Sequence, residues 1–193
     1  SFDWATEEIR KPEILGLQHF ESIPLEVLAT YIDWSPFFWA WQLHGVYPTI
    51  FNKPEVGTEA KKLFADGKKM LEDIIVNQRF TSRAVAGFWP ANTVGDDVEI
   101  YSDETRAEQL ATFHFLRQQR QKKEGQICRS LSDNVAPKDS GRIDYFGGFA
   151  LTMGQGVEDY AATFRDAGDD YTAIIVQSLG DRLAEASAEY LHK

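Results

Sequence analysis

The chain has 193 residues, enough for one domain with a substantial core, and its 43% share of hydrophobic residues is ordinary for a globular protein. Thirty acidic residues against twenty basic ones give a net charge of −10. That charge would repel a phosphate backbone, which argues against a nucleic-acid partner. No apolar run reaches membrane-spanning length, so no membrane partner is expected either.

The N-terminal part of the chain predicts an extended arm and a short helix. Residues 1–22 show no clear hydrophobic period and are expected to form an extended N-terminal arm. A helix over 25–32 should begin near Pro24, because proline is tolerated in the first turn. The chain should then turn at Pro36, which cannot donate a backbone hydrogen bond and disfavours a helical conformation of Ser35.

A long helix and a hairpin are expected next. The apolar residues of 56–75 fall on one face and the charged residues on the other, which predicts an amphipathic helix. A strand over 84–89, ended by Pro90, is expected to pair with a strand over 97–101. Turn-forming residues over 92–96 would join these two strands into an antiparallel hairpin with a fairly long loop.

The second half of the chain continues the mixed pattern. Residues 106–123 are basic, with apolar residues at helical spacing. A strand is predicted over 145–151, where paired glycines suggest close approach by another backbone or a ligand. Helices are predicted over 156–167 and 169–192. The pattern as a whole predicts an α+β fold, with a few antiparallel strands covered by helices.

No established catalytic motif stands out in the sequence. A nucleophile elbow, a phosphate-binding loop and a metalloprotease motif are all missing, and the four histidines lack the spacing of metal ligands. No metal site is therefore predicted. Cys128 is the only cysteine, which excludes an internal disulfide and fits a reducing cytoplasm. We expect Cys128 to be a small buried hydrophobic residue.

Two groups of carboxylates are candidate sites, each with two interpretations. Asp33 lies in an aromatic segment, where it could cap a helix or turn, or hold a cationic ligand beside aromatic walls. Asp181 and Glu185 lie one helical turn apart and so share a face, while Arg182 is expected to lie off that face. This pair could be a solvated acidic surface, or it could be compensated by a neighbouring basic residue or a cationic ligand.

Six strings of the sequence occur in the order found in the S-adenosylmethionine-binding reactivation domain of cobalamin-dependent methionine synthase. The chain resembles that domain over essentially its full length. The strings are YIDWSPFF (31–38), GFWPAN (87–92), VGDDVEIY (94–101), FLRQQ (115–119), VAPK (135–138), and DRLAEA (181–186) with AEYLH (188–192).

The resemblance implies a fold and a function. The fold would be a C-shaped single domain with a twisted antiparallel sheet flanked by helices. The function would be part of a methyltetrahydrofolate–homocysteine S-methyltransferase of methionine biosynthesis. The domain would bind S-adenosylmethionine for the reductive methylation of cob(II)alamin to methylcobalamin. Its expected partners are the cobalamin-binding domain, which would hold most of the cobalamin, and flavodoxin or a related reductase. The expected location is the cytoplasm.

The resemblance also assigns roles to three residues. Asp33 matches the family aspartate that contacts the ammonium of S-adenosylmethionine, and Glu185 matches a glutamate near the ligand and the cobalamin face. Asp181 is a weaker candidate for the same region. No catalytic residue is implied.

The family pattern continues with an Arg-x-x-x-Gly-Tyr segment that holds the ligand carboxylate, and residues 1–193 do not contain it. The sequence therefore predicts a domain truncated at its C-terminus, inactive alone, that binds S-adenosylmethionine weakly or not at all. One alternative is a docking module for the cobalamin domain and flavodoxin, with Arg117, Arg120, Lys122 and Lys123 as basic contacts. Another is a stand-alone S-adenosylmethionine-binding protein.

Overall fold

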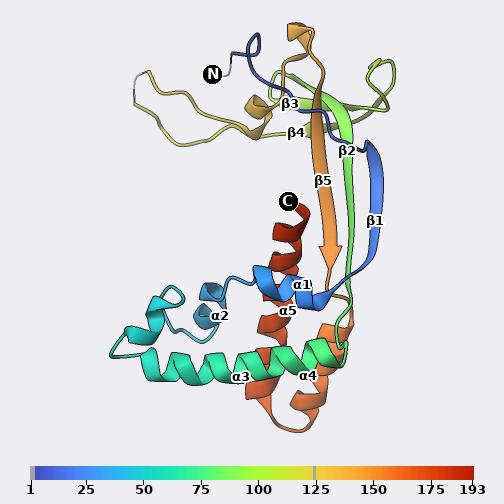
Figure 1. Cartoon of the computed structure of the whole chain (residues 1–193). Coiled ribbons are helices and arrows are strands. Elements are labelled where there is room, and N and C mark those ends of the chain that lie inside the picture. Colours follow the sequence, from blue (N-terminus) through green and yellow to red (C-terminus); the bar gives the residue numbers. More distant parts are fainter. Residues whose placement is uncertain (1–2, 124) are drawn as a thin grey trace. The chain divides into compact units, whose positions relative to one another are not determined.

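The computed structural model describes residues 3–123 and 125–193, and its elements are both helices and strands (Figure 1). The chain divides into two compact units. Unit 1 comprises the residues up to Gln18 and Ala86–Phe149, and unit 2 comprises His19–Val85 and Ala150–Lys193. The sheet has the order β1-β2-β3-β4, and β5 also pairs with β2. Its strands are β1 (Gly16–Ile23), β2 (Ser82–Val94), β3 (Asp97–Tyr101), β4 (Gln109–His114) and β5 (Asp144–Thr152).

The described helices form most of unit 2, and none of them is long and apolar enough to cross a membrane. Their apolar faces surround one core, whose fully buried side chains include Phe37, Phe38 and Leu179. The α-helices are α1 (Leu25–Leu28), α2 (Ser35–Trp39), α3 (Gly57–Val76), α4 (Gly156–Asp166) and α5 (Asp170–Leu191), with short 3₁₀ helices at Ala29–Tyr31 (η1) and Thr49–Asn52 (η2).

The start of unit 2 confirms one prediction and corrects another. The helix expected over 25–32 is formed by α1 and η1, and Pro24 is the residue that caps it. The turn expected at Pro36 is wrong, because helix α2 begins at Ser35 with Pro36 in its first turn. Proline is tolerated there because the first backbone N–H groups of a helix have no intrahelical partner.

The long helix α3 confirms the amphipathic pattern over 56–75, and its buried face contains a close contact. A Cβ atom added to Gly67 would lie 2.7 Å from Cζ of the fully buried Phe37. The missing side chain of Gly67 therefore makes room for the Phe37 ring against the helix.

Helices α4 and α5 confirm the two predicted C-terminal helices, and they pack against each other. A turn over 167–169 joins them, and Gly168 in that turn has a left-handed φ of 77°. The helices approach closely at Gly180, where an added Cβ would lie 2.6 Å from Cγ1 of Val157.

Unit 1 contains the predicted hairpin with a tighter loop. Strands β2 and β3 are antiparallel with Val94 opposite Asp97, which leaves only residues 95 and 96 in the loop. Gly95 has a φ of 65°, a conformation that glycine adopts easily. The expected end of the first strand at Pro90 is wrong, since β2 runs through it. Pairing with β3 begins at Ala91, directly after the proline, so the missing N–H costs that pairing no bond.

The helical spacing of the apolar residues over 106–123 does not correspond to a helix. Residues Gln109–His114 form strand β4, antiparallel to β3, and the residues described after it have no regular secondary structure up to position 123. The spacing of Leu110 and Phe113 resembles a helical stripe, but both side chains are about half exposed. They therefore lie on an edge strand that buries neither face fully.

Strand β5 confirms the strand predicted over 145–151, and its glycines have separate explanations. A Cβ on Gly147 would lie 2.4 Å from Cε1 of Phe88, so this glycine gives room to an aromatic ring. Apart from Gly148 and its chain neighbours, no described atom lies within 4 Å of the corresponding position at Gly148. Within the predicted N-terminal arm, the described residues from Gly16 onward form strand β1.

Candidate carboxylate site

Asp33 follows the 3₁₀ helix η1 and is exposed, while Ser35, two residues further on, is buried. Its Oδ1 accepts a hydrogen bond from the backbone N–H of Ser35 at 2.9 Å, at the first residue of α2. The hydroxyl of Ser35 in turn accepts from the backbone N–H of Tyr47 at 3.1 Å. This geometry is that of a turn cap, one of the two interpretations of Asp33. It uses one carboxylate oxygen, and no described residue donates a hydrogen bond to the other.

The other two candidates lie on α5, and the structure corrects the place of Arg182. Asp181 and Glu185 are both exposed. The guanidinium of Arg182 donates to both oxygens of Glu185, from Nη1 at 2.6 Å and from Nη2 at 3.0 Å. Arg182 was expected to lie off the shared face, but its long side chain reaches Glu185 three residues further along. The compensating cation therefore comes from the same helix.

The segment that leads to Asp33 packs on the C-terminal turns of α5. The ring of Tyr31 meets the ring of Tyr190 edge-on, with centroids 5.9 Å apart. The ammonium of Lys193 lies 4.6 Å from the centre of the same Tyr31 ring. Asp33 and Glu185 thus belong to packed elements of unit 2, although no hydrogen bond or ion pair joins them among the described residues.

Three residues near the candidate carboxylates were not identified from the sequence as part of a site. They are Arg182, Tyr31 and Tyr190. The arginine could have been found, because an arginine three residues before a glutamate in a helix is a favourable pair. The tyrosines could not, since nothing in the spacing shows that η1 packs on α5.

A large cavity lies elsewhere, in unit 1, and has a volume of about 1620 Å³. It contains none of the candidate carboxylates. Its lining includes the apolar Val94, Leu116, Ile127 and Leu131 together with polar side chains of the 128–139 segment.

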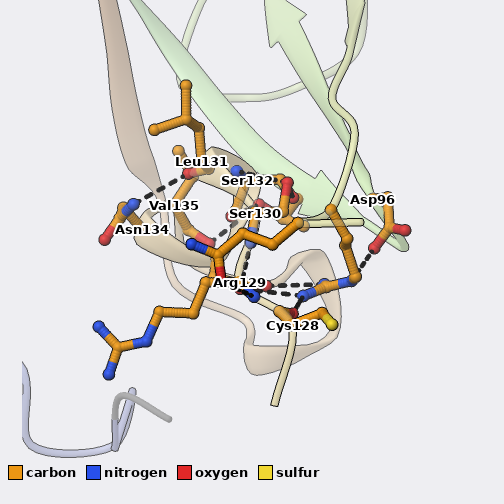
Figure 2. A network of polar contacts seen from close by, with 12 residues as sticks. Asp96, Cys128, Arg129, Ser130, Leu131, Ser132, Asn134 and Val135 are labelled. Atoms are coloured by element: carbon orange, nitrogen blue, oxygen red, sulfur yellow. Dashed lines mark hydrogen bonds and ion pairs between the residues drawn. The ribbon is translucent and has the colours of Figure 1, made fainter. Parts of the chain in front are cut away.

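A polar network lies in one wall of that cavity, and Figure 2 shows it around Cys128, Ser130 and Asp96. Arg117 donates to Asp133 in a two-bond fork at 2.7 and 2.9 Å, to Asp96 at 2.7 Å, and to the carbonyl of Cys128 at 3.0 Å. The hydrogen bonds from Arg117, and a further one from the backbone N–H of Ser130, lower the pKa of Asp133. Arg117 is thus occupied within its own unit.

Cys128 is half-buried rather than buried as expected. Its Sγ lies 3.7 Å from the carbonyl oxygen of Arg120, a weak hydrogen bond at most. The thiol lies on an irregular segment without a strand or helix to enclose it, which explains its partial exposure.

The comparisons with known proteins agree with each other. The family model described as "Vitamin B12 dependent methionine synthase, activation domain" matches residues 24–193. The chain is also 46% identical to the protein of a solved structure described as "Crystal Structure of the MetH Reactivation Domain bound to AdoHcy", with a TM-score of 0.93. That similarity covers 100% of this chain and 58% of the other, so this chain spans well under two thirds of that relative. The α+β fold is confirmed, and the chain belongs to the activation-domain family of vitamin B12-dependent methionine synthases.

Proposed function

We propose that this chain is the part of a cobalamin-dependent methionine synthase that binds S-adenosylmethionine and supports reductive methylation of the oxidised cobalamin. The observation that carries the proposal is the 46% identity, over the whole chain, to a reactivation domain solved with AdoHcy. AdoHcy is what S-adenosylmethionine becomes when it gives up its methyl group. The two molecules share nearly all of their atoms. A site that binds AdoHcy therefore offers most of the contacts that S-adenosylmethionine needs.

Asp33 and Glu185 are the residues we propose for the cationic end of the ligand, with Asp181 as a weaker candidate. S-adenosylmethionine carries an ammonium and a sulfonium, and ionised carboxylates stabilise both by Coulomb attraction, the ammonium also by charge-assisted hydrogen bonds. The Oδ2 atom of Asp33 has no partner among the described residues and can accept such a bond. The exposure of both side chains leaves them accessible to a ligand from solvent.

The cobalamin would be held mainly by another domain of the parent enzyme, where it supplies the cobalt centre that accepts the methyl group. The residues of this chain would bind and orient the methyl donor, with the carboxylates holding its methionine end. The domain would therefore not complete a reaction alone. We also propose a cytoplasmic location, supported by the single cysteine, Cys128.

Titration of the chain with S-adenosylmethionine, followed by two-dimensional amide NMR, tests the binding. This measurement detects millimolar dissociation constants, so it covers weak binding. We expect chemical-shift changes on ligand addition centred on Asp33 and Glu185. These changes should become smaller in Glu185→Gln and stay the same in Glu189→Gln. The control removes the same charge from an exposed residue one turn further along α5. Saturating ligand without shifts, or equal effects of both variants, would contradict the proposed site.

We further propose flavodoxin or a related acidic reductase as the electron donor, and the cobalamin-binding domain as the second partner. Segment 117–129 supports a docking role, because it has five basic residues against one acidic residue in a chain of net charge −10. Arg117 is held in ion pairs, but Arg120, Lys122, Lys123 and Arg129 form none among the described residues. We therefore propose these four as the basic docking residues, with Arg129 in place of the Arg117 expected from the sequence.

Flavodoxin binding tests the docking role directly. Lys122→Gln with Lys123→Gln should weaken binding about tenfold at low ionic strength, and the difference should shrink in high salt. Lys61→Gln with Lys69→Gln, two exposed lysines of α3, is the matched control. Equal affinity of both double variants for flavodoxin would show that the segment is not the docking surface.

A further inference from the structure

Arg182 and Glu185 form a charge pair whose two members face different surroundings. The side chain of Arg182 is only 12% exposed, whereas that of Glu185 is 64% exposed. The arginine therefore approaches the carboxylate from the protein side and leaves its other side to solvent. A ligand that reaches Glu185 would meet a carboxylate that is already held by two hydrogen bonds.

The fork between these residues leaves room for a second partner. An ionised carboxylate has about four lone-pair sites, and Arg182 occupies one on each oxygen. The remaining sites point away from the guanidinium. Glu185 can therefore keep Arg182 and accept a further hydrogen bond from a ligand, with its side chain already fixed in one orientation.

The pair also changes the charge that a ligand experiences. Glu185 and Arg182 form a pair of opposite charges, while Asp33 forms no ion pair among the described residues. S-adenosylmethionine and AdoHcy differ by one positive charge, at the sulfur atom. The site binds the sulfonium ligand more tightly than the thioether by an amount that depends on how far Arg182 cancels the charge of Glu185.

Building on the proposed function, we propose that Arg182 is a positioning and specificity-determining residue of the S-adenosylmethionine site. It fixes the Glu185 carboxylate toward the ligand, and its positive charge reduces the preference of the site for the sulfonium ligand over its neutral demethylated product. The arginine itself does not touch the ligand.

The dissociation constants of S-adenosylmethionine and AdoHcy, measured for the same variants, test this role through their ratio. Arg182→Gln removes the charge and should raise the preference for S-adenosylmethionine about threefold to tenfold, the effect of one charge a few ångströms away in a partly hydrated site. Arg182→Lys keeps the charge but loses the fork, and should weaken both ligands by a similar factor. Lys69→Gln, an exposed lysine of α3, should leave both constants unchanged.

A merely structural role for Arg182 would weaken both ligands equally, so an unchanged ratio in Arg182→Gln overturns the inference. If that variant fails to fold, Glu185→Gln provides the second test. It leaves the charge of Arg182 unbalanced and should lower the preference for S-adenosylmethionine, and an unchanged ratio there also overturns the inference. If the wild-type chain binds neither ligand, the proposed function fails, and this inference fails with it.

Discussion

Asp33 accepts a hydrogen bond from Ser35 and is also the residue proposed to meet the ligand ammonium, and two substitutions separate these roles. Asp33→Asn keeps an acceptor oxygen for the backbone N–H and removes only the charge. Asp33→Ala removes both. The two variants should therefore agree in ligand binding and differ in stability.

The stability effect follows from the exposed turn. Asp33 lies one residue before the N-cap Trp34 but accepts from the first backbone N–H of α2, as a cap would. Replacing a helix-capping aspartate by alanine costs about 1 kcal/mol, while asparagine is about as good a cap as aspartate, and we expect similar effects here. For a chain of 193 residues, 1 kcal/mol corresponds to a fall in Tm of about 2–4 °C. We expect that fall in Asp33→Ala and almost none in Asp33→Asn.

The binding effect follows from the lost charge. A hydrogen bond to a charged group contributes about 1.5–3 kcal/mol, so both variants should bind S-adenosylmethionine about 10-fold to 150-fold more weakly. Thermal unfolding followed by circular dichroism measures the first effect, and the NMR titration measures the second. Wild-type affinity in Asp33→Asn would show that Asp33 only stabilises the turn, and an unchanged Tm in Asp33→Ala would refute its role as a cap.

Two further predictions concern the packing and the polar network. Gly67→Ala should lower the free energy of unfolding by up to about 2 kcal/mol, because overpacking against Phe37 outweighs a gain in helix propensity of about 1 kcal/mol. In a Phe37→Leu background the same change should be neutral or stabilising, and urea unfolding that shows no such coupling would contradict the packing argument. In the folded protein the pKa of Asp133 is lowered from its unfolded value near 3.8. The pair of Asp133 with Arg117 therefore stabilises the fold fully above pH 3.8. This stabilisation is lost as the pH falls through the lower pKa of the folded state. Near pH 6 the wild type should be more stable than Asp133→Asn by about 1 kcal/mol or less, as for a partly exposed pair. This difference in the free energy of unfolding should shrink below about pH 4. A difference that does not change with pH would argue against the ion pair.

Sequence periodicity predicted the long elements well because their buried faces are continuous. Helix α3 buries Ala60, Leu63, Gly67, Leu71 and Ile74 at regular intervals, and that pattern is visible without a structure. The apolar residues of the edge strand β4 lie at helical spacing because the strand buries neither face, so the alternation typical of a strand is missing.

The two misread prolines share a physical reason. Whether proline ends an element depends on which backbone hydrogen bonds that element uses at the proline. Pro36 lies in the first turn of α2, and Pro90 lies just before the pairing of β2 with β3 begins. The sequence shows the missing donor but not whether a bond was needed there.

The candidate site was only partly accessible to sequence reasoning. Asp33, Asp181 and Glu185 could be selected by residue type and spacing, and Asp33 makes the contact expected of a cap. The fork from Arg182 depends on the rotamers of two long side chains, which the spacing alone does not determine.

The close approach of α4 and α5 at Gly180 determines which way the second half of α5 faces. Because Val157 fills the space that a side chain would occupy there, α5 can pack against α4 only when Gly180 faces it. Each residue of an α-helix turns the chain by about 100°, so one residue inserted between Gly180 and Glu185 would rotate the carboxylate by that angle. The distance along the helix from the glycine to the glutamate is therefore as much a part of the proposed site as the glutamate itself.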